Sequence, residues 1–250
     1  MVRKEILIGM TVIVEIADKK ADEKTLDKIF AYFKSVDEKF STYKNTSEIT
    51  AINNGLLKEE NFSPEMKEVL ALSEKTKNET GGYFDIRKPD GKLDPSGLVK
   101  GWAIFKAAEI LWRDGFENFY IDAGGDIQTS GKNSEGEMWS VGIRNPFNPE
   151  KEIVKVLSVS GQGVATSGTY ARGEHIYNPH EKSAARGDLL SLTVVGPNVY
   201  EVDRFATAAF AMGEKSLDFI SGVAGLEAFA IDKAGMASQT AGFEKYVKQK

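Results

Sequence analysis

The chain has 250 residues, of which 41% are hydrophobic and 28% charged, a composition that indicates a globular protein and excludes a disordered one. The formal net charge is −5 and the basic residues are scattered among acidic ones, so nucleic acid is excluded as an expected partner. The absence of cysteine excludes disulfides, thiolate metal sites and a cysteine nucleophile.

The N-terminus gives no targeting signal. Arg3 and Lys4 precede only a short apolar run, which is not the core of a signal peptide. No segment approaches the length of a membrane span. We expect a chain that is cytoplasmic as written, and a chain trimmed of an export signal would read the same way.

The first elements form a strand and a helix. Residues 6–16 alternate like a strand that is interrupted at Gly9, Met10 and Thr11, where a bulge or a close backbone approach is expected. An amphipathic helix begins at Asp22, and we interpret its apolar stripe as core. That stripe consists of Leu26, Ile29, Phe30, Phe33 and Phe40.

Two shorter helical segments follow. A polar loop at residues 40–49 leads into a short helix that ends near Gly55. The next helix begins with Ser63 as its cap and Pro64 in its first turn. A glycine-rich turn at residues 81–85 comes after it.

The central stretch, residues 93–131, combines a helix start with a lysine. Asp94 or Ser96 is expected to cap a helix that ends at Gly115. Lys100 falls in the first turn of this helix. Unpaired amide hydrogens and the helix dipole make such an N-terminus attractive to phosphate.

A glycine pair, Gly124 and Gly125, follows a predicted strand at residues 119–121, and there backbone can approach a ligand closely. The helix start and the glycine pair together indicate an anion site for a phosphorylated ligand. The alternative is a capped helix with no ligand. Neither a Rossmann spacing nor a P-loop is present.

The second half mixes strands and helices without a regular βαβ rhythm, which favours an α+β fold over a doubly wound sheet. Residues 163–168 are small and polar, a composition that suits backbone contact with a ligand. A helix is expected at residues 202–212. Strands are expected at residues 139–143, 154–159, 189–195, 226–231 and 242–247.

Asp203 and Thr207 lie four residues apart on a predicted helix, so their oxygens project from one face. A carboxylate and a hydroxyl suit a hard cation such as Mg²⁺, which is commonly shared with substrate phosphates. In the alternative interpretation, Asp203 only stabilises the first turn of its own helix.

Two histidines, His175 and His180, follow the small polar stretch. His175 is a candidate base, because histidine titrates near neutral pH. A histidine in a loop is also a common polar contact, and the two histidines alone do not make a full metal-ligand set.

Taken together, the segments resemble the ApbE-type FAD:protein FMN transferases. The resemblance covers most of the chain and rests on several blocks in one order. They are Gly9-Met10-Thr11, Phe40-Ser-Thr-Tyr43, Gly82-Tyr83-Phe84-Asp85, Asp94-Pro-Ser-Gly97-Leu-Val-Lys100-Gly101-Trp-Ala103, Ala123-Gly124-Gly125-Asp126, Ala165-Thr166-Ser167-Gly168, His175-Ile176 and Asp203-x-x-Ala206-Thr207.

The resemblance implies an α+β fold of mixed, mainly antiparallel sheets with flanking helices, in one domain over residues 1–250 or in two intertwined lobes. It implies FAD as substrate with Mg²⁺, and transfer of the FMN moiety to a threonine or serine hydroxyl of a client protein, with release of AMP. Clients of the family carry a motif Asp-Gly-x-Thr/Ser-Gly-Ala-Thr, which this chain lacks. The segment between Asp85 and Asp94 is shorter than in larger members, which leaves adenine recognition open.

Roles carry over from the family residue by residue. Asp203 and Thr207 would bind Mg²⁺ through their side chains, with the Ala165 carbonyl as third ligand. His175 would act as base toward the client hydroxyl, and Lys100 would hold the FAD phosphates. The FAD-binding residues would be Gly9, Met10, Thr11, Tyr43, Asp85, Asp94, Gly97, Lys100, Gly124, Gly125, Asp126, Thr166 and Ser167.

Two other functions are compatible with the same residues. If water replaced the client hydroxyl, the protein would be an FAD pyrophosphatase that yields FMN and AMP. If no turnover took place, it would be a carrier that binds FAD.

Overall fold

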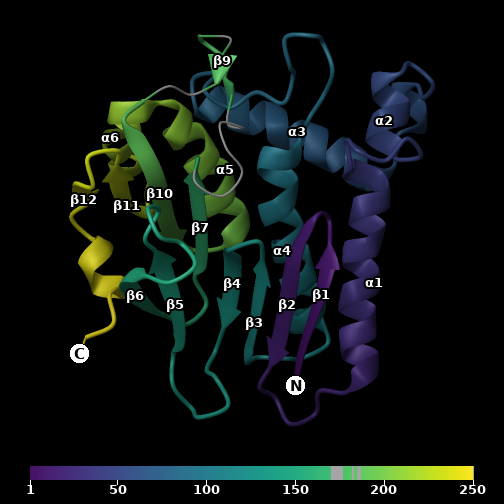
Figure 1. The fold of residues 1–250 in the computed structure, drawn as a ribbon. Coiled ribbons are helices and arrows are strands. Elements are labelled where there is room, and N and C mark those ends of the chain that lie inside the picture. The colour runs from purple at the N-terminus through teal and green to yellow at the C-terminus, as the bar shows by residue number, and fades with distance from the viewer. Residues whose placement is uncertain (170–176, 182, 185–186, 250) are drawn as a thin grey trace.

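A computed structural model describes residues 1–169, 177–181, 183–184 and 187–249 of the chain. Its central feature is an eight-stranded sheet in the order β1-β2-β3-β4-β7-β10-β11-β12, with every neighbouring pair antiparallel (Figure 1). The strands of this sheet are β1 (Val2–Leu7), β2 (Met10–Ile16), β3 (Phe119–Ala123), β4 (Asp126–Ser130), β7 (Gly163–Gly168), β10 (Leu189–Gly196), β11 (Glu227–Asp232) and β12 (Ala237–Gln239).

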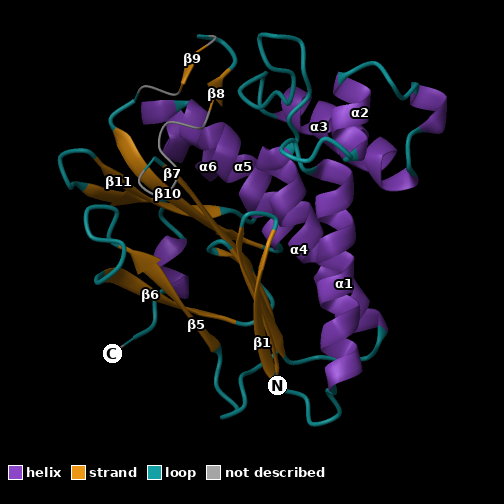
Figure 2. Ribbon diagram, turned by 45° about the vertical axis from the view of Figure 1, so that its right-hand side comes forward, coloured by secondary structure: helices purple, strands orange, loops and turns teal. Residues whose placement is uncertain are grey.

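The α-helices gather on one face of the sheet (Figure 2). Their apolar side chains pack with alternate residues of the strands, such as Val12 and Val14 of β2, into the larger of two hydrophobic cores. The helices are α1 (Glu23–Phe40), α2 (Glu48–Asn53), α3 (Pro64–Glu79), α4 (Ser96–Arg113), α5 (Val199–Ala211) and α6 (Ser216–Ser221).

The opposite face of the sheet is covered by a hairpin of β5 (Trp139–Arg144) and β6 (Ile153–Val159) (Figure 2). Its buried residues pack with side chains such as Phe229 of β11 into the second core. A small hairpin of β8 (Tyr177–Asn178) and β9 (Ser183–Ala184) lies apart from the sheet. The 3₁₀ turns are η1 (Glu59–Asn61), η2 (Gly213–Lys215) and η3 (Phe243–Tyr246).

The expected α+β fold with mainly antiparallel sheets and flanking helices is confirmed. The N-terminal strand differs in detail from the prediction, because residues 2–16 form the β1–β2 hairpin rather than one bulged strand. Ile8 and Gly9 form its two-residue turn with φ values of 54° and 67°. Positive φ at both central residues is what the right-handed twist of a tight hairpin requires.

Two further predictions are corrected near the C-terminus. Most of the expected strand at residues 242–247 is instead the 3₁₀ turn η3, in which the buried Phe243 ring packs against Phe229 at a centroid distance of 5.6 Å. The expected helix at residues 202–212 begins three residues earlier, at Val199 of α5, where the Asn198 side chain accepts a hydrogen bond from the backbone N–H of Glu201.

The predicted cap of α4 is also wrong in detail. The residue at the cap position is Pro95, which makes no side-chain capping bond. Asp94 instead accepts a hydrogen bond from the backbone N–H of Ser96, at 3.2 Å. Within the described part of the chain, no helix is long and apolar enough to cross a membrane.

Candidate functional site

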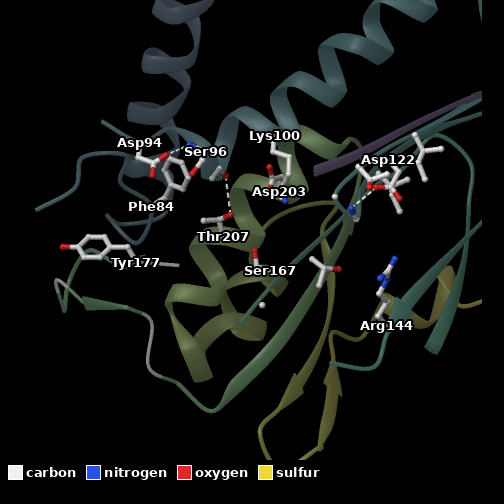
Figure 3. Close-up of a pocket in the computed structure, with 18 of the residues that line it drawn as sticks. Phe84, Asp94, Ser96, Lys100, Asp122, Arg144, Ser167, Tyr177, Asp203 and Thr207 are labelled. Atoms are coloured by element: carbon white, nitrogen blue, oxygen red, sulfur yellow. Dashed lines mark hydrogen bonds and ion pairs between the residues drawn. The ribbon is translucent and has the colours of Figure 1, made fainter. Parts of the chain in front are cut away.

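A cavity of about 680 Å³ lies where the N-terminal end of α4 meets α5, the β3–β4 turn and β7 (Figure 3). The loop after α3, the end of β5 and single residues of other strands also contribute to its walls. Much of the predicted site is brought together here from segments far apart in the sequence. The predicted residues that line it are Thr11, Asp85, Asp94, Gly97, Lys100, Gly124, Gly125, Thr166, Ser167, Asp203 and Thr207.

Lys100 lines this cavity and connects two buried carboxylates, one of which, Asp203, also lines it. Its Nζ lies 2.5 Å from Oδ2 of Asp126 and 3.9 Å from Oδ1 of Asp203. Asp126 is 1% exposed and Asp203 4%. Lys100 is the fifth residue of α4, just beyond the first turn predicted for it, and the N-terminal end of the helix adds its own positive potential to this part of the cavity.

Asp203 loses its proton less readily here than a free aspartic acid does. Burial raises its pKa well above the usual value, and the neighbouring Asp126 carboxylate raises it further, while Lys100 only partly opposes these effects. A second cation beside the carboxylate would favour its ionised form.

Gly101 allows α5 to approach α4 closely. Its backbone N–H donates a hydrogen bond of 2.7 Å to Oδ2 of Asp203. A Cβ at this position would stand 2.6 Å from Cβ of Asp203 and 2.8 Å from the carbonyl oxygen of Val199. The neighbouring residues Lys100 and Gly101 therefore contribute in different ways. The lysine places a positive charge in the cavity, and the glycine lets α5, which carries Asp203, pack closely on α4.

Replacing Gly101 by alanine is expected to destabilise the protein by about 2–3 kcal/mol, because the added methyl group forces two packed helices apart. The urea midpoint of unfolding would measure this loss. An unchanged midpoint would show that the approach of the two helices is not as tight as described.

Thr207 lies one turn beyond Asp203 on α5, and its oxygen faces the start of α4. Its Oγ1 lies 3.4 Å from the carbonyl oxygen of Gly97. A Cβ on Gly97 would touch Cγ2 of Thr207 at 3.1 Å and Cε2 of Phe84 at 3.3 Å. A carboxylate, a hydroxyl and a carbonyl oxygen thus come together at one end of α4, and all three are hard oxygen donors of the kind that Mg²⁺ prefers.

The alternative role of Asp203 as a helix cap is excluded by the position of the cap. Asn198 occupies that position, so the first turn of α5 does not depend on Asp203. The N–H of Val199 is held by the buried Gln128, whose Oε1 accepts a hydrogen bond of 2.8 Å. Among the described residues, no three histidine, cysteine or acidic side chains gather as a metal-binding group, so a cation here would need hydroxyl, carbonyl or ligand oxygens as well.

Two acidic residues of the cavity wall are each paired with a lysine: Lys88, which also lines the cavity, and Lys77, which does not. Asp94 pairs with Lys88 at 2.5 Å and Asp85 with Lys77 at 2.7 Å. Burial opposes ionisation of Asp94, but Lys88 and the Ser96 hydrogen bonds outweigh it and hold the pKa of Asp94 below its usual value. Asp94 thus remains an acceptor for ligand hydroxyl or amine groups at neutral pH.

The predicted glycine pair forms the tight β3–β4 turn, with φ values of 63° at Gly124 and 94° at Gly125. The N–H of Gly125 donates to Oδ1 of Asp122 at 2.8 Å, and burial raises the pKa of this aspartate. The turn therefore exposes backbone to the cavity, as the glycine pair predicts, and adds a carboxyl group to the wall.

Several predicted residues lie away from the cavity or outside the described residues. Gly9, Met10 and Ala165 are not among the residues that line it, and Tyr43 is 97% exposed at a loop outside it. Asp126 lies behind the wall and reaches the cavity through Lys100. His175 lies outside the described residues, so its role remains a prediction. Nε2 of His180 is 3.0 Å from the carbonyl oxygen of Gly81.

Other lining residues were not predicted as site residues. Asp122, Arg144 and Tyr177 are the clearest examples, and Figure 3 shows Asp122 and Arg144 at the opposite end of the cavity from Tyr177. Asp122 adjoins the glycine pair in the sequence, which was an available signal. Arg144 reaches the cavity only because the β5–β6 hairpin packs on the sheet, and nothing near it in the sequence indicates this.

A comparison of the sequence with models of known protein families gives a match. The sequence profile of the ApbE family matches residues 8–88 and 86–230, well over half of the chain. The chain belongs to the ApbE family. Among curated ApbE relatives, the FAD:protein FMN transferase of Escherichia coli K12 is 28% identical over 166 residues, which are 63% of this chain and 47% of that protein. The chain thus spans about half the length of this relative.

A relative from Haemophilus influenzae, also named FAD:protein FMN transferase, is 24% identical and is matched over 77% of this chain and 73% of its own length. Two solved ApbE structures show the same fold. The flavin transferase ApbE of Vibrio cholerae superposes with a TM-score of 0.86 at 19% identity, covering 98% of both chains. The ApbE protein of Thermotoga maritima gives 0.87 at 19% identity, covering 100% of this chain and 99% of the other.

Proposed function

We propose that this ApbE-family protein transfers the FMN moiety of FAD to a threonine or serine hydroxyl of a client protein, with Mg²⁺ bound and AMP released. The observation that carries the proposal is the meeting of Lys100, Asp203, Thr207 and the Gly97 carbonyl at the N-terminal end of α4. These groups supply what a pyrophosphate needs, namely positive charge and oxygen ligands for a cation.

The size and shape of the cavity support a ligand as large as FAD. Its volume of about 680 Å³ falls within the range of roughly 300–1,000 Å³ that small-molecule sites occupy. The charged cluster lies between the two ends, with Asp94 and Tyr177 toward one and Asp122 and Arg144 toward the other (Figure 3). A dinucleotide whose pyrophosphate lies at the cluster would extend toward both ends.

The residues present fit Mg²⁺. Asp203 and Thr207 would bind it through their side-chain oxygens. We propose Gly97 rather than Ala165 as the carbonyl ligand, because the Gly97 oxygen lies 3.4 Å from Oγ1 of Thr207, whereas Ala165 is not among the lining residues. When bound, the ion would neutralise charge on the pyrophosphate and on the departing AMP.

The transfer replaces a phosphoanhydride bond of FAD by a phosphate ester bond to the client. The client hydroxyl attacks the phosphorus of the FMN half, its proton passes to a base, and the bond between this phosphorus and the bridging oxygen breaks, so that AMP leaves with that oxygen. Lys100 would hold the phosphates in line for this attack. His175 stays the base that the sequence predicts.

The test is incubation of the purified protein with FAD and Mg²⁺, with and without an acceptor protein carrying Asp-Gly-x-Thr-Gly-Ala-Thr. We expect the acceptor to gain the mass of FMN less water, and one AMP to appear for each acceptor labelled. A matched acceptor with alanine at the modified threonine should gain nothing.

Each other product would identify a different function. Free FMN and AMP without labelled acceptor would make the protein an FAD pyrophosphatase. Intact FAD in both incubations would leave only a carrier.

A further inference from the structure

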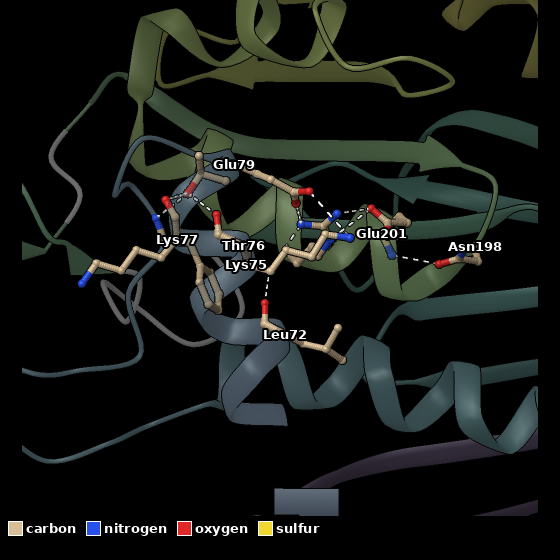
Figure 4. Close-up of polar contacts among 10 residues, drawn as sticks. Leu72, Lys75, Thr76, Lys77, Glu79, Asn198 and Glu201 are labelled. Atoms are coloured by element: carbon tan, nitrogen blue, oxygen red, sulfur yellow. Dashed lines mark hydrogen bonds and ion pairs between the residues drawn. The ribbon is translucent and has the colours of Figure 1, made fainter. Parts of the chain in front are cut away.

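Arg204, the residue after Asp203, has a buried guanidinium group whose partners come from two helices. It is 2% exposed, and its Nε donates to Glu201 at 3.0 Å within α5. Its Nη1 donates to Glu79 and, at 3.3 Å, to the hydroxyl of Thr76, both in the last turns of α3. Figure 4 shows the carboxylates of Glu79 and Glu201 approaching each other from the two helices. The planar guanidinium group suits two carboxylates at once, which a lysine could not match.

The end of α3 continues directly into a wall of the cavity. The backbone N–H of Gly82 donates to the carbonyl of Lys77 at 2.8 Å, and that of Phe84 donates to the hydroxyl of Thr80 at 3.2 Å. These bonds join residues 82–84 to the last turn of α3, so a displacement of this turn would move the wall with it. Tyr83, Phe84 and Asp85 all line the cavity.

The same wall packs against the oxygen cluster. Cε2 of Phe84 lies 3.3 Å from the point where Gly97 would carry a Cβ, and Cγ2 of Thr207 lies 3.1 Å from the same point. The Phe84 ring therefore lies close to the start of α4, beside the oxygen cluster but without adding an oxygen to it. Asp203, in contrast, is held by the N–H of Gly101 and does not depend on this wall.

We propose that Arg204 is a positioning residue, which clamps the last turn of α3 to α5 and so holds the wall of residues 80–86 in its place along the cavity. The proposal goes beyond the FMN-transfer function and, for its effect on FAD, rests on it. Because the clamp acts on the shape of the cavity and leaves Asp203 in place, its loss should weaken FAD binding more than it slows the chemical step.

Glu79→Ala is the variant of choice, because the Glu79 side chain is 38% exposed and Arg204 keeps Glu201 as a partner, so the protein should fold. Lys75→Ala is the matched control: it removes an exposed contact to the same Glu79, 3.7 Å away, without touching Arg204. We expect Glu79→Ala to raise KM for FAD about ten-fold while kcat changes less than about two-fold, in the range reported for residues that couple to a site without contacting the ligand. Arg204→Lys should likewise raise KM for FAD with little change in kcat. Lys75→Ala should change neither constant.

Hydrogen exchange gives a readout that does not depend on turnover. Amides of residues 80–86 should exchange several-fold faster in Glu79→Ala than in the wild type or in Lys75→Ala. If the wild type bound FAD without turning it over, the proposed transfer would fail, while the FAD dissociation constants and the exchange rates would still test the clamp. A lower unfolding temperature in Glu79→Ala, with exchange at 80–86 and FAD affinity unchanged, would overturn the clamp and leave Arg204 a purely structural residue.

Discussion

Asp203→Asn is expected to lower Mg²⁺-dependent turnover of FAD about a thousand-fold, because under the proposed function the cation would lose the one carboxylate ligand assigned to it and with it several kcal/mol of charge stabilisation. Asparagine keeps the size of the side chain and can still accept the hydrogen bond from the N–H of Gly101. Initial rates of AMP release measured over a range of Mg²⁺ concentrations would test this. Wild-type turnover at limiting Mg²⁺ would contradict the assignment of Asp203.

The same substitution should stabilise the metal-free protein. The pKa of Asp203 is raised in the folded state, whereas the unfolded chain has a value near 3.8. The folded protein therefore binds the proton more tightly, and the contribution of Asp203 to stability falls as pH rises from about 4 through its raised folded pKa. In EDTA, the unfolding temperature of Asp203→Asn minus that of the wild type should increase between pH 4 and pH 8. If the difference in unfolding temperature stayed constant with pH, the pKa of Asp203 would not be raised in the folded protein.

Lys100→Met is expected to remove activity and to cost about 3 kcal/mol of stability, because it leaves the buried Asp126 carboxylate without its cation. For a protein of this size, that loss corresponds to roughly 6–12 °C in unfolding temperature. The matched control is Lys88→Met, which breaks the pair with Asp94 at the rim, where the Lys88 side chain is 51% exposed. The control should cost less than about 1 kcal/mol.

A double variant separates the two roles of Lys100. Adding Asp126→Asn to Lys100→Met removes the unpaired charge and should restore most of the stability, while FAD turnover stays absent. If the double variant were as unstable as Lys100→Met alone, the loss would come from packing of the lysine stem rather than from the ion pair.

Local sequence patterns located much of the site, because several of its groups lie next to a turn or a helix start. Lys100, Gly124 and Gly125 are of this kind, and the structure brings all three to one cavity. The spacing of Asp203 and Thr207 placed both on one face of a helix, but spacing alone left a cation ligand and a helix cap as alternatives. Asn198 occupies the cap position and so excludes a capping role for Asp203, which became visible only when the start of α5 was known, while the cation role stays a prediction.

Other features depend on contacts between segments far apart in the sequence. Gly101 is explained by the Asp203 side chain about a hundred residues later, and Arg204 by Glu79 in a different helix. For Tyr43, the family motif predicts a flavin contact, whereas the structure places its side chain 97% exposed and outside the cavity. No periodicity or spacing rule contains these long-range contacts.

We propose that a cation and a pyrophosphate meet at Asp203, Thr207 and the Gly97 carbonyl. Crystals grown with Mn²⁺ and ADP, which carries the pyrophosphate but has no flavin to transfer, would test it through the anomalous signal of manganese. We predict one strong peak in contact with all three oxygen donors and with the ADP phosphates, with Lys100 on the same phosphates. ADP bound in the cavity with manganese elsewhere, or with no manganese peak, would contradict the account.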